Sequence, residues 1–307
     1  PDVRKLSPWE FVDLRKIPFL LKWCTEFTSI LETQSNLSQL AYNECTLVCS
    51  VLYIPEKQML DHKLIWDGAK SKLKKYLHEE QIRHIIDGNP YEILINEDWP
   101  LMTDAARFGI TDRRVKPIRK RTDFNEGEDG TVHMVFTVEG CHTLSDGLQT
   151  FNVPVIKQNL DNLLTMAAVI SINLTHIEQS TLCNHAFGML FVDHIKFKPT
   201  GNKISNDGID VIKHFYSRKV MIDVKHMALA SRLHLYKLRE TTEFQAIKQP
   251  IACTHAGFTG IKIKEIPDYI FDYKRAGGNA GHTRLLQNKP VKYGGAFMRP
   301  AFNASSI

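Results

Sequence analysis

Apolar residues in this chain gather in short, nearly continuous runs, separated by longer segments in which they recur with a different spacing. The runs are rich in β-branched residues and are bounded by turn or helix signals. This pattern is typical of parallel strands that are buried on both faces. Strands are predicted over Thr46–Ile54, His133–Glu139, Val169–Leu174, Val220–Val224 and Pro250–Thr254.

Between these runs, apolar residues recur at every third or fourth position, as on one face of an amphipathic helix. Helices are predicted over Met59–His78, Leu144–Ala167, Asp207–Arg218 and Ala228–Phe244. Because strands and helices alternate along the chain, we expect an α/β fold with a parallel sheet.

One stretch interrupts the alternation. Asp87–Asp129 is rich in Gly, Pro, Asp and Asn, and its segment NEGEDG (residues 125–130) is typical of an exposed turn. We therefore expect a loop-rich excursion at about 87–129 within a single domain that spans residues 1–307.

Composition and charge are those of an ordinary globular protein, with 43% hydrophobic and 24% charged residues. The net charge of +5 is spread along the chain, and its densest basic stretches are Arg113–Arg121 and Lys70–Lys75. Neither stretch carries an aromatic stacking platform, which argues against a nucleic-acid partner. The longest apolar segments have about ten residues, too few to span a bilayer.

The six cysteines lie at positions 24, 45, 49, 141, 183 and 253, and no two have C-x-x-C spacing. We interpret them as reduced, buried thiols of an intracellular protein. No signal peptide is recognisable at the N-terminus, so we expect a cytoplasmic location.

Candidate chemistry follows the predicted strands, at the point where each strand ends. Glu139 and His142 follow one strand, His176 follows the next, and His226 and His255 follow the last two. The carboxyl ends of parallel strands share one side of a sheet, which is where (β/α) barrels carry their active sites. We therefore expect these side chains to converge.

Neutral imidazoles and carboxylates are the ligands that zinc prefers, at roughly 2.0–2.2 Å. A carboxylate can also bridge two cations about 3.5–4 Å apart that together activate a water molecule. Glu139, His226 and His255 would make most of such a site, whereas His142 and His176 are weaker ligand candidates, and His176 could equally contact substrate. A single histidine near a strand end is more often a surface or cap residue; four such ends in a row favour a site. We assign four other histidines of this region to structural or surface positions: His133, His185, His194 and His214.

Four segments resemble motifs of the membrane dipeptidase (renal dipeptidase, peptidase M19) family of the amidohydrolase superfamily. TVEGCHTL resembles its Ile-Glu-Gly-Gly-His segment, and INLTH its Leu-Thr-His motif. VMIDVKHMA resembles Ile-Asp-Leu-Ser-His-Met, and PIACTHAG resembles Pro-Val-Ile-Ala-Ser-His-Ser. The four occur in the family's order and cover residues 135–260, somewhat under half of the chain.

This resemblance implies a (β/α)8 TIM-type barrel with a binuclear zinc site. It implies that Glu139 bridges the two metal ions, that His226 and His255 bind one of them, and that His176 contacts the substrate or the tetrahedral intermediate. Glu139 and His176 would be the catalytic residues. The implied activity is that of a zinc-dependent dipeptidase-like hydrolase, which cleaves a dipeptide or related amide bond with a metal-activated water.

The chain also departs from the family. It has no His-x-Asp before Glu139, no Gly-Ser-Asp-Phe-Asp-Gly-like segment near its end, and lysines in GFTGIKIKEIP where the family has a substrate-binding Arg. Lys225 replaces the Ser before His226, and Cys141 replaces the second Gly of the first motif. We expect the chain to be the middle of a longer protein, or else a divergent relative that has lost part of its site.

Three functional alternatives follow from these departures. The first is the dipeptidase-like hydrolase, with a dipeptide or another small molecule as substrate. The second is another amidohydrolase, such as a lactonase or deacylase, and the third is a catalytically inactive barrel that acts as a binding or scaffold protein. Barrels of this class often pair, which makes a homodimer an option.

Overall fold

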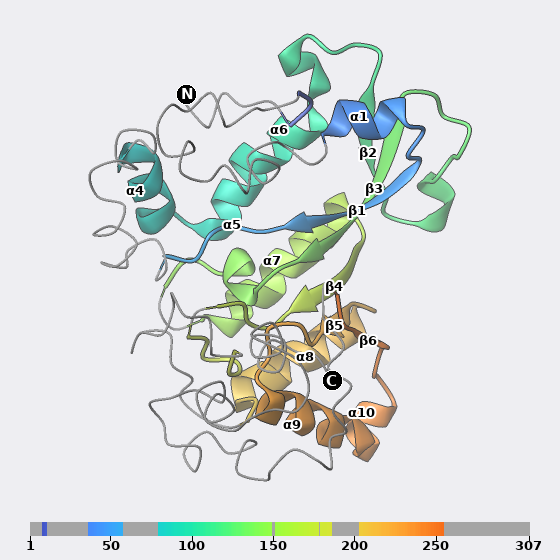
Figure 1. The fold of residues 1–307 in the computed structure, drawn as a ribbon. Helices are drawn as coiled ribbons and strands as arrows, with labels where there is room; N and C mark the ends of the chain where they lie inside the picture. The colour runs from blue at the N-terminus through green and yellow to red at the C-terminus, as the bar shows by residue number, and fades with distance from the viewer. Residues whose placement is uncertain are drawn as a thin grey trace, which may run out of the picture. The chain divides into compact units, whose positions relative to one another are not determined.

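The structure is a computed structural model, and it describes residues 8–10, 36–57, 79–148, 151–177, 179–185 and 203–254. The chain divides into two compact units. One comprises Pro1–Phe136 with Asn162–Ala168, and the other comprises Thr137–Asp161 with Val169–Ile307. Strand β3 and helix α7 each pass from one unit to the other, and Figure 1 shows the elements along the chain.

In the first unit, β3 is hydrogen-bonded to β1 and β2, and the β2–β3 pair is parallel. Helices α5, η4 and α6 run on as one helix, because the backbone keeps right-handed helical angles at the junctions. The elements described in this unit are α1 (Leu37–Tyr42), β1 (Leu47–Leu52), α4 (Glu79–Asp87), α5 (Pro90–Ile93), η4 (Leu94–Asp98), α6 (Trp99–Thr103), η5 (Ala105–Phe108), β2 (Arg114–Pro117), η6 (Arg121–Asp123) and most of β3 (Thr131–Val138).

In the second unit, the strand order runs from the end of β3 through β4 and β5 to β6, and the β4–β5 and β5–β6 pairs are parallel. The register pairs Asn173 of β4 with Asp223 of β5, and Asp223 with Ala252 of β6. The elements described here are η7 (Cys141–Leu144), α7 (Val153–Met166), β4 (Val169–Asn173), α8 (Asn206–Ser217), β5 (Met221–Asp223), α9 (Leu229–Glu240), α10 (Thr242–Gln245) and β6 (Ile251–Ala252).

The core of the second unit is formed by aliphatic side chains of helices and strands. Helix α8 lies against β5 (Figure 1), and it begins at Ser205, whose hydroxyl accepts a hydrogen bond from the Gly208 amide at 3.0 Å. A Cβ atom at Gly208 would lie 2.3 Å from the Leu182 carbonyl oxygen, so only glycine permits this approach. The fully buried core residues include Ile156, Leu160, Ile172, Val211, Ile212, Phe215, Ile222 and Leu235.

The predicted α/β fold with a parallel sheet is confirmed, and all five predicted strands are present. Four lie within their expected ranges, whereas β3 begins at Thr131, two residues before its predicted start. Three of the predicted helices appear as α7, α8 and α9 with α10, whereas Met59–His78 lies outside the described residues. The parts of the chain that the structure describes contain six strands. Closure of the sheet into an eight-stranded barrel stays a prediction. The expectation that residues 1–307 form a single domain also stays a prediction.

Two details differ from the expected pattern. Strand β1 is not buried on both faces: its side chains alternate in exposure, and Leu47 and Val51 are 50% and 54% exposed. Residues 87–129, expected to be loop-rich, contain the helical elements α5 to η6 and strand β2. Strand β2 was missed because Arg114–Pro117 has four residues, two of them basic and one a proline.

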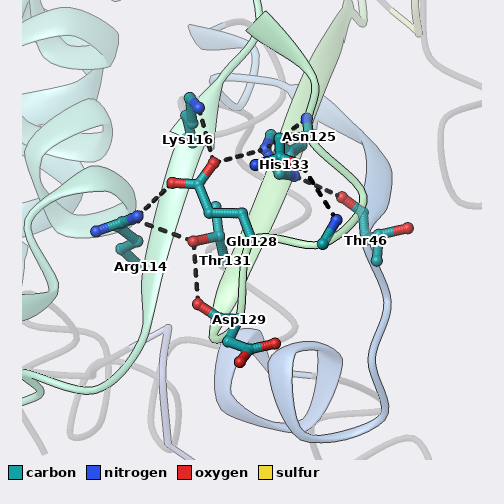
Figure 2. A network of polar contacts seen from close by, with 9 residues as sticks. Thr46, Arg114, Lys116, Asn125, Glu128, Asp129, Thr131 and His133 are labelled. Atoms are coloured by element: carbon teal, nitrogen blue, oxygen red, sulfur yellow. Dashed lines mark hydrogen bonds and ion pairs between the residues drawn. The ribbon is translucent and has the colours of Figure 1, made fainter.

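A polar network ties β2 and β3 together around the carboxylate of Glu128 (Figure 2). Glu128 pairs with Arg114 and with Lys116, whose Nζ lies 2.8 Å from Oε2. The buried ring of His133 lies 3.3 Å from the same carboxylate oxygen, and its Nδ1 lies 3.0 Å from the carbonyl oxygen of Thr46. His133 is therefore a structural residue, as its sequence context predicted.

Five of the six cysteines lie in the described residues, and no disulfide joins any two of these five. Cys141 and Cys183 are buried, as expected for thiols inside apolar segments. Cys49 and Cys253 are exposed, so the expectation that all the cysteines are buried is wrong for these two. Among the helices that the structure describes, none has the length and apolar character needed to cross a bilayer.

Candidate metal site

Glu139 lies at the point where β3 ends and the chain turns sharply. Gly140 follows with a φ of +83°, which side chains rarely adopt. A Cβ atom at this position would lie 2.4 Å from the His142 ring and 3.3 Å from Cβ of His176. Glycine is therefore required here, and its turn keeps the carboxylate of Glu139 at the carboxyl end of the strand.

The short helix η7, which follows this turn, closes on the residues around Glu139. The Thr143 hydroxyl donates to the Glu139 carbonyl oxygen at 3.3 Å, and the Ser145 hydroxyl donates to the His142 carbonyl oxygen at 2.7 Å. His142 is buried, with 5% of its surface exposed. These contacts fix the backbone on both sides of Gly140, so that the position of Glu139 depends on more than the strand itself.

His226 lies three residues after the last residue of β5, and its backbone is left-handed with a φ of +65°. A non-glycine residue in this region costs roughly 1–2 kcal/mol. The surrounding structure must therefore hold this conformation, and strain of this kind concentrates at functional sites. His176 follows β4 by three residues without such strain.

The side chains of Glu139, His176 and His226 meet in one cluster, hereafter the Glu–His–His cluster. Nε2 of His226 lies 3.0 Å from Oε1 of Glu139, and Nε2 of His176 lies 3.5 Å from the same oxygen. The two imidazole rings meet edge to face, with centroids 4.2 Å apart. One potential ligand atom from each residue lies within 4.8 Å of the other two.

The cluster is neither fully buried nor open. The side chains of Glu139, His176 and His226 are 19%, 14% and 15% exposed. Much of the surrounding water is therefore excluded from these side chains, and electrostatic interactions are stronger in such an environment than in bulk water.

Burial also decides the charge of the His226 ring. It lowers the pKa of His226 below its usual value, although the hydrogen bond that the ring donates to Glu139 opposes this effect. The neighbouring His176 ring lowers the pKa further. The imidazole is therefore neutral at neutral pH, which is the form that binds a metal ion.

A buried lysine stands beside the cluster. Lys225, directly before His226, is 8% exposed. Burial lowers its pKa, while the nearby Cys253, Asp223 and Glu139 act in the opposite direction. The sequence showed a lysine at position 225, where the resembled motif has a serine. It did not show that this lysine side chain is buried.

The donor set fits a divalent metal ion. Two imidazole nitrogens and one carboxylate oxygen are the usual ligand types of zinc. In a zinc complex with bonds of roughly 2.0–2.2 Å, ligand atoms lie roughly 3.3–3.6 Å apart, close to the separations of Glu139 from both histidines.

The structure brings together three of the predicted site residues. Glu139 and His226 lie side by side as expected. His176, which was predicted to contact the substrate, also offers a potential ligand atom to the cluster, and its role stays a prediction. His142 is not a member of the cluster, and His255, the third predicted ligand, lies outside the described residues.

Asn173 is a residue that the sequence reasoning missed. Its amide donates to the carbonyl oxygens of Asp223 and Lys225, at 3.4 and 3.1 Å, and so supports the turn that leads to His226. An amide side chain near the end of the mostly apolar run VISINL was the available signal.

No protein-family model matches the chain, and no curated protein matches it in sequence. Among solved structures it is distantly similar to the probable dipeptidase PvdM from Pseudomonas aeruginosa, with 16% identity, a TM-score of 0.44, and coverage of 76% of this chain and 48% of the other.

Two further structures show similar values. A metallo peptidase from Rhodobacter sphaeroides, liganded with a phosphinate mimic of the dipeptide L-Ala-D-Ala, has 12% identity and a TM-score of 0.40, over 72% of this chain and 56% of the other. Dipeptidase AC, a metallo peptidase of family M19, has 12% identity and a TM-score of 0.40, over 72% and 53%. The chain thus spans about half the length of these proteins, and the functional argument rests on the geometry of its own site.

Proposed function

We propose that this chain carries part of the active site of a metal-dependent hydrolase that cleaves a dipeptide or related amide bond. The observation that supports the proposal is the Glu–His–His cluster, in which residues 139, 176 and 226 approach one another from the ends of three different strands. Such convergence at the carboxyl ends of parallel strands is the usual arrangement of an α/β active site.

In this proposal, Glu139, His176 and His226 hold a divalent ion, with zinc favoured by the ligand types. When bound, the ion would supply a Lewis acid that polarises the scissile carbonyl and lowers the pKa of a water molecule. The family resemblance adds a second ion bridged by Glu139, and His255 as a further ligand.

The protein's own residues prepare the cluster for this chemistry. The lowered pKa of His226 keeps the ring neutral at neutral pH, so that only one of its two ring nitrogens carries a proton. The single carboxylate of Glu139 offsets only part of the charge of a divalent ion. The positive charge that remains, reinforced by the buried Lys225, would favour the oxyanion that develops during attack on an amide.

The proposal is tested on the full-length protein by its metal content and by hydrolysis of a panel of dipeptides, N-acyl amino acids and lactones. We expect bound zinc and turnover of at least one dipeptide, and we expect Glu139→Gln to lose both. The matched control is Glu243→Gln, the same change at an exposed residue of α10 that pairs with Lys213. A wild-type protein with no bound metal and no turnover would instead favour a binding or scaffold role, and turnover of lactones or N-acyl amino acids alone would favour another amidohydrolase.

A further inference from the structure

Asp223, at the end of β5, is a buried carboxylate whose two oxygens both accept hydrogen bonds. It is 2% exposed. Oδ1 accepts from the backbone amides of Lys225 at 2.9 Å and Thr254 at 3.3 Å, and Oδ2 accepts from the Thr254 hydroxyl at 2.5 Å. One side chain therefore ties the turn after β5 to the end of β6.

The neighbouring strand β4 reinforces this connection. The Asn173 amide donates to the carbonyl oxygens of Asp223 and Lys225. Together these bonds satisfy the backbone on both sides of Val224, whose own amide donates to the Ala252 carbonyl oxygen at 2.9 Å. Each of the three strand ends thus contributes to holding one turn.

The residue that this turn presents is His226. Its left-handed backbone is unfavourable for a residue with a side chain, and such a conformation persists only where neighbouring contacts hold it. The bonds of Asp223 and Asn173 end at Lys225, the residue directly before His226.

We infer that Asp223 is a positioning residue, which holds the His226 imidazole against Glu139 by fixing the turn between β5 and α9 to the ends of β4 and β6. The inference deepens the proposed function and rests on it for the identity of the ligands. The claim that Asp223 maintains the contact between His226 and Glu139 does not depend on a metal ion. This contact can therefore be measured in the metal-free protein.

The carboxylate suits this position better than an amide would. A carboxylate only accepts hydrogen bonds, and all three partners of Asp223 are donors. In Asp223→Asn, one of the two positions becomes an NH2 group, which either faces a backbone N–H or forces the Thr254 hydroxyl to accept instead of donate. This change keeps the size of the side chain, but it removes the negative charge that strengthens all three bonds and reverses or removes at least one of them.

The test compares full-length wild type, Asp223→Asn and a matched control, Asp161→Asn. Asp161 also accepts three hydrogen bonds, two from Arg218 and one from His214, but it lies on α7. The readout is the ring signals of isotope-labelled histidine in NMR spectra of the chelator-treated protein, with the His226 signal assigned from its loss in His226→Gln. A zinc titration of each variant follows.

We expect the His226 signal to move or broaden in Asp223→Asn and to remain unchanged in Asp161→Asn, with zinc affinity at least tenfold weaker only in the former. An unchanged His226 signal in folded Asp223→Asn would overturn the inference, even if the melting temperature fell, because a merely structural role would lower stability alone. Wild type that binds no zinc would overturn the proposed function and leave the NMR comparison decisive for Asp223.

Thr254→Val provides a second variant, should Asp223→Asn fail to fold. It removes only the hydroxyl that donates to Oδ2 and leaves both backbone bonds in place. We expect a smaller change in the same His226 signal, and an unchanged signal in this variant would also reject the inference.

Discussion

Nε2 of His226 lies 3.0 Å from Oε1 of Glu139, although the two residues are 87 positions apart in the sequence. The imidazole N–H donates and the carboxylate accepts, so that each group holds the other in place without a metal ion. A divalent ion that binds both groups must replace this hydrogen bond with two coordination bonds, and the proton must leave Nε2 before that nitrogen can bind the ion.

Stability should depend on pH through His226. The pKa of His226 is lowered in the folded protein, so the unfolded chain binds a proton more readily below its ordinary value of 6.5. Stability is therefore fully present above about pH 6.5 and is lost as the pH falls through the lower pKa of the folded state. Urea unfolding of metal-free protein at pH 7.5 and pH 5.5 should show a smaller pH effect in His226→Gln than in wild type. An equal change in stability between the two pH values in both proteins would contradict a lowered pKa of His226 in the folded state.

The position of His176 leads to a prediction that separates a ligand from a substrate contact. If His176 is a ligand, His176→Gln should lower zinc affinity by at least tenfold, because one of three donors is lost. If it contacts only the substrate, zinc content should stay at the wild-type level while KM or kcat changes. Equilibrium dialysis against zinc, followed by kinetics at saturating metal, distinguishes the two roles.

Glu128 should stabilise the first unit in a pH-dependent way. Lys116 and Arg114 lower its pKa from 4.5 to about 2 in the folded protein. Its contribution is therefore present above pH 4.5 and is lost as the pH falls through about 2. Glu128→Gln should unfold at a lower temperature than wild type at pH 7, and the difference should narrow on acidification. A constant difference from pH 7 to pH 2 would show that charge plays no part.

Asp98 should have the opposite effect. Burial, followed by the neighbouring Glu97, raises its pKa from 3.8 to about 6. Because the folded state holds a proton that the unfolded chain releases, stability is lost as the pH rises through about 6. Asp98→Asn should therefore raise the unfolding temperature at pH 7.5, with little effect at pH 4. Glu97→Gln, the same type of change at the adjacent position, is the control and should have the smaller effect.

Leu160 offers a test of the packing between α7 and the strands. Its side chain is fully buried, so Leu160→Ala should cost about 2–5 kcal/mol in the free energy of unfolding. Leu148, which is 62% exposed, provides the matched control, and Leu148→Ala should change the free energy by less than about 0.5 kcal/mol. Chemical denaturation measures the free energy of unfolding of both variants. Similar losses in the two would contradict the placement of Leu160 in the core.

The strands and helices of the second unit could be predicted from the sequence because their signals are local. The run VISINL and the helical spacing in Asp207–Arg218 indicate which positions are buried. Hydrophobic periodicity of this kind can be recognised within a short segment of the sequence. The position of Glu139, His176 and His226 after three consecutive strands was visible for the same reason, and parallel pairing then brings the strand ends together. Strand β2, with four residues, was too short for a periodic signal.

Tertiary structure alone decided which side chains meet. The sequence places a histidine after β4 and another after β5, but it does not say that both rings turn towards Glu139. That outcome depends on the φ of +83° at Gly140, the φ of +65° at His226 and the hydrogen bonds of Asp223, which join residues about 30 to 50 positions apart. Hydrophobic periodicity records whether a position is buried, whereas the direction of a side chain after a strand depends on backbone angles that distant contacts hold.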